Sequence, residues 1–131
     1  MAEFIGADVP KASDVERAIR TTANTHKKLD ILVNNDGITK GPLPLEDLEE
    51  ELWDKILSVN LKSIFLGCKY AIPIMEKSGG GVIINTASIG GVRPRPERSA
   101  YSTSKGGAII LTKAWPWHWR LTIFESTASA L

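Results

Sequence analysis

The stretch GGGVIINTASIGGVRPRPERSAYSTSKGGAIILTKA (residues 79–114) decides the expected fold, because it holds a strand pattern, a loop and a helix pattern in succession. Three glycines lead into an apolar run that is typical of a buried strand. Residues 92–98 place two prolines among charged side chains, which predicts a stiff, solvated loop. Residues 101–114 follow as a helix, so the stretch predicts one strand–loop–helix unit.

The same alternation extends toward the N-terminus. Apolar runs at residues 3–9 and 30–34 predict two more strands. Residues 13–29 and 41–77 predict helices with one apolar face, and Pro73 is expected to bend the end of the second. Strands alternating with helices indicate an α/β fold with a doubly wound parallel sheet, in which ligands bind at the carboxyl ends of the strands.

Composition narrows the class of protein. The 131 residues fit one globular domain, and the formal net charge of +1 gives no general attraction to nucleic acid or an anionic membrane. Cys68 is the only cysteine, so neither an internal disulfide nor a metal site is expected. No apolar run approaches membrane-spanning length, and Glu3 and Asp8 stand where a signal peptide needs a basic start. A cytoplasmic location is therefore expected.

Three side chains near the end of the chain form a candidate for acid/base chemistry. Tyr101 and Lys105 are four residues apart on the predicted helix, so they project from one face. An ammonium beside a phenol favours the phenolate and eases proton exchange near neutral pH. Ser88 ends the preceding strand, where its hydroxyl can bind a substrate oxygen. Taken alone, the Tyr-x-x-x-Lys spacing also fits an ordinary solvated helix face.

Five motifs together resemble those of the short-chain dehydrogenase/reductase family. They are Ala-Asp-Val at 7–9, Asn-Asn-Asp-Gly at 34–37, Asn60, Ile-Asn-Thr-Ala-Ser at 84–88 and Tyr-Ser-Thr-Ser-Lys at 101–105. The chain is most similar to the small single-domain type that includes 3-oxoacyl carrier-protein reductases and glucose 1-dehydrogenase-like enzymes. The resemblance implies an incomplete Rossmann-like sheet made of the family's third, fourth and fifth strands.

The resemblance also implies an activity, namely hydride transfer between NAD or NADP and a small carbonyl or alcohol substrate. In the family's terms, Tyr101 would be the general acid/base and Ser88 would hold the reacting oxygen. Lys105 would tune Tyr101 and bind the nicotinamide ribose, and Asn60 would organise a water in the proton relay.

Four further residues are implied in binding the dinucleotide. Asp8 and Val9 would contact the adenine, and Asn35 and Gly37 would pass their backbone beside the adenine ribose. Each position has a plain structural alternative. Asn60 can satisfy a helix kink, Asp8 can cap the following helix, and the Asn35–Gly37 segment can be an ordinary turn.

The chain departs from the family pattern in several places. The glycine-rich motif Thr-Gly-x-x-x-Gly-x-Gly has no counterpart in these residues, so dinucleotide binding is expected to be impaired. In the family's sheet, the first and second strands lie between the strands expected here at residues 3–9 and 30–34. These residues hold no counterpart of those two strands, which predicts open sheet edges. Asp36 adds a negative charge where the family has alanine. Arg93, Arg95 and Arg98 fit either a solvated loop or a contact with an anionic substrate.

The end of the chain is unusual, since three of its four tryptophans lie in residues 115–119. Tryptophan has a single codon, and a shifted frame through this region encodes alanines alternating with Leu, Met or Val, as in the family's own continuation. We infer a one-base deletion near the codon of Ala114. This divides the chain into a partial NAD(P)-binding domain (1–114) and an aberrant, poorly ordered tail (115–131). The alternative is a Trp-rich tail for a membrane interface or a binding groove.

Three functional hypotheses follow from these observations. The chain is an oxidoreductase of the short-chain type, a catalytically silent fragment of one, or an interaction module that pairs with a full-length relative. In the family, the helices at residues 49–77 and 101–114 form a subunit interface, so a homo-oligomer through them is also expected.

Overall fold

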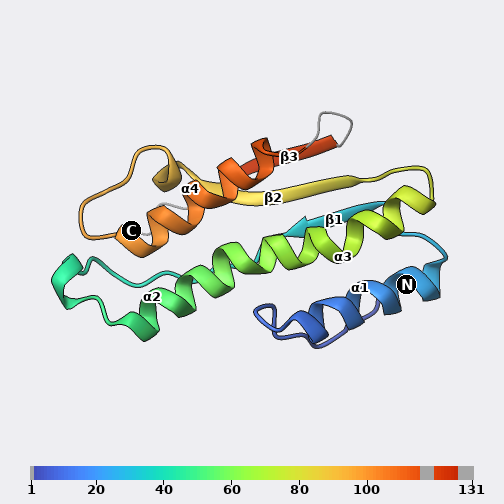
Figure 1. Cartoon of the computed structure of the whole chain (residues 1–131), viewed down its shortest axis with the longest axis horizontal. Coiled ribbons are helices and arrows are strands. Elements are labelled where there is room, and N and C mark those ends of the chain that lie inside the picture. The colour runs from blue at the N-terminus through green and yellow to red at the C-terminus, as the bar shows by residue number, and fades with distance from the viewer. Residues whose placement is uncertain (1, 116–119, 127–131) are drawn as a thin grey trace.

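The computed structural model describes residues 2–115 and the backbone of residues 120–126. Helices and strands alternate along the chain, as the sequence predicts (Figure 1). In chain order the elements are α1 (Ala12–His26), β1 (Ile31–Asn34), η1 (Leu45–Asp47), α2 (Glu50–Leu57), η2 (Ser58–Lys62), α3 (Ser63–Lys77), β2 (Val82–Ser88), η3 (Ile89–Gly91), α4 (Ser99–Lys113) and β3 (Arg120–Ser126).

The sheet has the order β1-β2-β3, and both pairs of neighbours are parallel. Ile31 pairs with Val82 and Asn34 pairs with Asn85, so β1 and β2 end at the same edge. Helices connect the strands, which is the arrangement that parallel pairing requires. The fold class is therefore confirmed as α/β with a partial Rossmann-like sheet.

The core lies between the sheet and the helices. In Figure 1, α3 runs between α1 and α4; the strands pack against α3 and α4, and α1 packs against α3. The fully buried apolar side chains of this core are Cys68, Ala71, Met75, Ile83 and Ala108. Side chains alternate along a strand, and Ile31 and Val33 of β1 are 58% and 55% exposed. Within the described residues, that side of β1 is not covered.

The prediction of a strand at residues 3–9 is wrong. Residues 2–8 have no regular secondary structure and lead into a turn before α1, and Phe4 is 95% exposed. A strand needs a neighbouring strand to accept its ladder of hydrogen bonds, and this segment has none among the described residues. Its backbone is held locally instead. The Lys11 N–H donates to the Asp8 carbonyl at 2.8 Å, and Arg17 donates to the Gly6 carbonyl at 2.8 Å.

The long helix before β2 contains a wider turn that the sequence did not reveal. It begins at Glu50, and residues 58–62 form the π-type segment η2 between α2 and α3. Such segments insert a residue into the helical ladder and often occur at functional sites. Here the wider turn carries Asn60, which is fully buried. Pro73 lies within α3, which continues to Lys77.

Residues 120–126 form β3 beside β2, a strand that the sequence analysis did not predict. The division into a partial domain and an aberrant, poorly ordered tail stays a prediction. The frame-shift hypothesis itself stays a prediction. Residues 116–119 and 127–131, which include Trp117 and Trp119, lie outside the described residues. None of the described helices is long and apolar enough to cross a membrane.

Candidate functional site

The carboxyl ends of β1 and β2 bring several expected site residues to one edge of the sheet. β1 ends at Asn34 and is followed directly by Asn35 and Gly37, and β2 ends at Ser88. The helix α4 begins eleven positions later at Ser99 and packs against both β2 and η3. Its first turn carries Tyr101, so the loop and the helix of the predicted unit meet at this edge (Figure 1).

Lys105 links α4 to the ends of both strands. Its side chain is only 4% exposed, and its Nζ donates a hydrogen bond of 2.8 Å to the backbone carbonyl of Thr86. A Cβ added to Gly37 would lie 3.5 Å from the same Nζ, so the glycine backbone passes close to the ammonium. Burial disfavours the charged form and lowers the pKa of Lys105 below its ordinary value.

Asn60 ties the turn after β1 to two helices. Its Nδ2 donates to the Ile38 carbonyl at 2.9 Å and to the Ser104 hydroxyl at 3.0 Å. Its Oδ1 accepts from the Ile38 N–H at 2.8 Å. The side chain therefore pairs with Ile38 much as a neighbouring strand would. This anchors the segment next to Gly37.

Ser88 and Tyr101 flank the turn that follows β2. The Ser88 Oγ accepts a hydrogen bond of 3.2 Å from the Gly90 N–H, which leaves its own O–H free to donate. A Cβ added to Gly90 would lie 3.5 Å from both the Ser88 Oγ and the Tyr101 Cε1. The serine hydroxyl and the tyrosine ring therefore face the same small region beside Gly90.

The structure adds residues that sequence reasoning missed. Gly91 packs on the backbone of α4, where an added Cβ would lie 2.6 Å from the Gly106 nitrogen. The Thr86 hydroxyl donates to Asn35 Oδ1 at 3.0 Å, beside the Thr86 carbonyl that holds Lys105. Gly91 lies outside the family motifs considered above, and Thr86 lies within the motif at 84–88 but was given no role there. Only the spatial arrangement identifies what these two residues do.

A buried chain of polar side chains fixes the register of the two strands. Asn34 Nδ2 donates to Asn85 Oδ1 at 2.8 Å, and Asn85 Nδ2 donates to the Thr112 hydroxyl at 3.1 Å. The two asparagines are register partners, Asn34 at the end of β1 and Asn85 in the middle of β2. Because buried polar groups need partners, this chain favours one pairing of the strands over a slipped one. The sequence signal for this contact is the asparagine in each of two family motifs, Asn34 in residues 34–37 and Asn85 in residues 84–88.

Asp8 and Val9 lie apart from this group. The Asp8 N–H donates to Asp14 Oδ2 at 3.0 Å, and its carboxylate pairs with Lys11 at 3.2 Å. The first of these contacts lowers the pKa of Asp14. No hydrogen bond or ion pair in the described part of the chain joins Asp8 or Val9 to the other candidates. Nor does Asp8 cap α1, whose N-cap residue is Lys11.

The structure therefore assembles six of the eight candidate residues around the ends of β1 and β2: Asn35, Gly37, Asn60, Ser88, Tyr101 and Lys105. A phenol, a serine hydroxyl with a free proton and a buried ammonium meet there. Such groups can stabilise a developing oxyanion and transfer a proton to it.

Comparison with known proteins identifies the family. Residues 1–122 match the family model described as short chain dehydrogenase. The 2-(R)-hydroxypropyl-CoM dehydrogenase of Xanthobacter autotrophicus is 43% identical over 114 residues, which cover 84% of this chain and 45% of that protein. The levodione reductase of Leifsonia aquatica is 36% identical over 107 residues, covering 82% and 40%.

The suspected subgroup is also represented among the relatives. The 3-oxoacyl-acyl-carrier-protein reductase of Thermotoga maritima is 34% identical over 108 residues, which cover 82% of this chain and 44% of that protein. The chain thus spans less than half the length of these relatives. Since the family model matches most of the sequence, the chain belongs to the short chain dehydrogenase family.

Proposed function

We propose that this edge of the sheet is the catalytic corner of an oxidoreductase that transfers hydride between NAD or NADP and a small carbonyl or alcohol substrate. The observation that carries the proposal is the buried Lys105 ammonium, bonded to Thr86 and beside the bare backbone of Gly37. Tyr101 and Ser88 flank Gly90 in the same region. Membership of the short chain dehydrogenase family, whose enzymes generally use NAD or NADP, supports it.

The residues of the chain supply the proton chemistry. In the reducing direction, the Tyr101 phenol gives its proton to the carbonyl oxygen while Ser88 donates a hydrogen bond to that oxygen. The phenolate that remains is stabilised by the positive charge of Lys105. A nicotinamide cofactor held at this corner would supply the hydride for the carbonyl carbon. Asn60 holds Ile38 in place, and we assign to it the family's further role of organising a relay water.

The corner fits the ribose of a nicotinamide cofactor. Gly37 is exposed and has no side chain to block an approach to Lys105. An ammonium has three donors, and Thr86 occupies one of them, so donors are left for ribose hydroxyls. We assign the backbone of Asn35 and Gly37 to cofactor contact as well. The adenine contacts expected of Asp8 and Val9 find no support in this arrangement.

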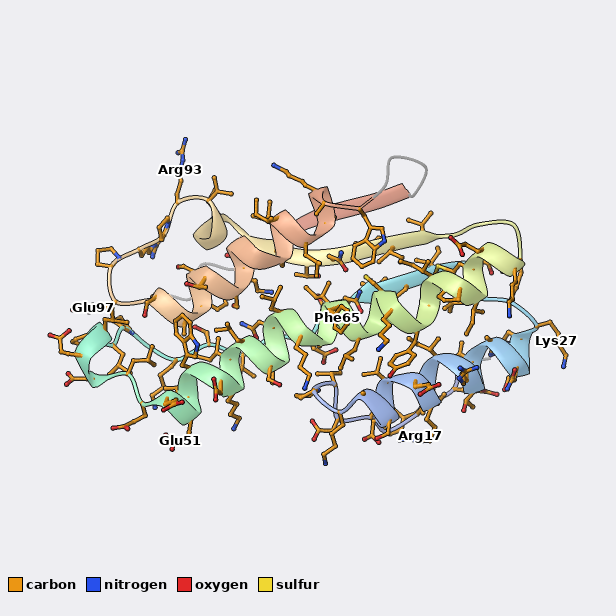
Figure 2. All side chains as sticks on the ribbon, in the orientation of Figure 1. Arg17, Lys27, Glu51, Phe65, Arg93 and Glu97 are labelled. Carbon is orange, nitrogen blue, oxygen red and sulfur yellow. The ribbon has the colours of Figure 1, made fainter. Side chains whose placement is uncertain are left out.

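We also propose a homo-oligomer through the helical face. An open groove of about 1030 Å³ lies between α2, η2 and α3 on one side and α4 on the other. Its lining is mainly apolar, and Phe65 (Figure 2) and Ile110 remain 44% and 65% exposed. A second copy would cover this surface. The buried free thiol of Cys68 fits a reducing, cytoplasmic location, which we propose too.

Tyrosine substitution tests the proposed function. Oxidation of NADPH or NADH with a small ketone is measured for the wild type, Tyr101→Phe and Tyr70→Phe, the last altering the only other phenol in the chain. We expect Tyr101→Phe to lose activity by about a hundredfold or more, and Tyr70→Phe to keep it. Equal rates for the wild type and Tyr101→Phe would contradict the assignment. If the wild type binds the reduced cofactor without oxidising it, the silent-fragment hypothesis holds instead.

A further inference from the structure

Arg98 differs from the other arginines whose side chains the structure describes. Arg17 and Arg20 form ion pairs with acidic neighbours on α1. Arg93 and Arg95 are exposed, and Figure 2 shows Arg93 extending away from the helices. Arg98 is half-buried, at the residue that precedes α4. Arg98 is therefore less exposed than the other described arginines, although its side-chain hydrogen bond lies at the surface.

The guanidinium of Arg98 is oriented but not neutralised. Its Nη1 donates to the Thr39 hydroxyl at 3.4 Å, which is an uncharged acceptor. Among the described residues no acidic side chain forms an ion pair with it. A guanidinium has five N–H donors in a planar fork that matches the oxygens of an anion. The donors of this fork that Thr39 does not occupy can form charge-assisted hydrogen bonds with an anionic ligand.

A second cation and the catalytic tyrosine share the space beside Arg98. Arg98, Lys40 and Tyr101 line one hollow of about 20 Å³. Lys40 lies in the segment after β1, whereas Arg98 and Tyr101 come from the end of the loop and the start of α4. Tyr101 thus has its Cε1 close to Gly90 and is also one of the residues that line this hollow.

The hollow is held by contacts between its two loops. The Leu43 N–H donates to the Glu97 carbonyl at 2.8 Å, in addition to the bond from Arg98 to Thr39. Glu97 has a φ of 61°, a left-handed conformation that is strained for a non-glycine residue. The Leu43 contact keeps the backbone in this conformation. Glu97 also lines the hollow, so the three charged lining residues sum to one positive charge.

We propose that Arg98, assisted by Lys40, binds an anionic group at the far end of the substrate that reacts at Tyr101. The inference rests on the proposed function and adds a substrate class, namely small oxo and hydroxy compounds that end in a carboxylate or a similar oxyanion. Because Arg98 precedes Tyr101 by only three residues, a short linker joins the anion to the reacting carbon. Arg93 and Arg95 take no part in this contact.

Binding of two matched ketones tests the inference without any nicotinamide. The probes are 4-oxopentanoate and 2-pentanone, which share the ketone but differ in the carboxylate. They are titrated into the ¹⁵N-labelled chain, and the amide shifts of residues 97–101 are followed. The variants are Arg98→Gln and the matched control Arg93→Gln, which removes a charge from the same loop.

We expect saturable shifts with 4-oxopentanoate and an increase of about tenfold or more in its Kd for Arg98→Gln, since charge-assisted hydrogen bonds are lost. Arg93→Gln is expected to match the wild type, and 2-pentanone to bind equally weakly to all three chains. The inference is overturned if 4-oxopentanoate causes no saturable shifts, if Arg98→Gln binds it as the wild type does, or if both variants weaken equally. Cofactor binding measured on the same chains reports separately on the proposed function.

Discussion

The Lys105 Nζ donates a 2.8 Å hydrogen bond to the backbone carbonyl of Thr86, so a buried ammonium joins helix α4 to the end of strand β2. This contact fixes where the charge lies relative to the strand ends. Tyr101 is one helical turn earlier on α4, and the backbone of Gly37 passes close to the ammonium. The proposed proton donor and the proposed ribose site therefore both lie beside one buried side chain.

Gly91 is predicted to be intolerant of any side chain. In Gly91→Ala the new Cβ would lie 2.6 Å from backbone atoms of α4, which cannot move as a side chain does. We expect a loss of about 1–3 kcal/mol in the free energy of unfolding, measured by urea denaturation. Gly41→Ala is the control, because its Cβ would meet open space. Equal stability of the two variants would show that η3 does not pack on α4 as described.

Cys68 is predicted to make the free energy of unfolding vary with pH in the alkaline range. Burial raises the pKa of this thiol from 9.0 to about 11. The folded chain therefore keeps a proton that the unfolded chain releases, and stability is lost as the pH rises from 9 toward 11. Over this pH range we expect the free energy of unfolding of the wild type to fall by about 2 kcal/mol relative to that of Cys68→Ala. Below pH 9 the difference in the free energy of unfolding between the two chains should stay constant. Parallel pH profiles for the two chains would contradict the burial of the thiol.

The apolar groove predicts that assembly depends on Ile110. This side chain is 65% exposed on α4 and lines the groove together with Phe65 and Leu61. Ile110→Glu places a charge where a second copy is proposed to pack, so we expect the mass in solution to fall to that of the monomer in light scattering. Lys113→Glu changes the charge of an exposed α4 residue that does not line the groove and should leave the mass unchanged. A monomeric wild type would overturn the proposed assembly.

Much of the fold was predictable because its signals are local. The apolar runs of β1 and β2 and the helical spacing of α1, α3 and α4 each depend on a few neighbouring residues. The expected strand at residues 3–9 failed because an apolar run becomes a strand only beside a neighbour. The strand β3 was missed because its run was attributed to an aberrant tail.

The site was predictable only in part. Ser88, Tyr101 and Lys105 were identified by their order and spacing, and the structure brings them to one edge. The π-type turn around Asn60 is stabilised by contacts with Ile38 and Ser104, which come from elsewhere in the chain. These contacts join residues that are far apart in the sequence, so a local sequence pattern cannot predict them. The close approach of Gly91 to α4 could not be predicted for the same reason.

Binding of reduced nicotinamide mononucleotide tests the central claim most directly, because this half of the cofactor needs only the corner around Lys105. Its titration is followed by the amide shifts of Gly37, Tyr101 and Lys105 in the wild type, Lys105→Met and the exposed control Lys113→Met. We predict saturable shifts at these residues, a Kd raised about tenfold or more in Lys105→Met, and no change in Lys113→Met. Equal affinity of the wild type and Lys105→Met, or shifts confined to other parts of the chain, would contradict the account.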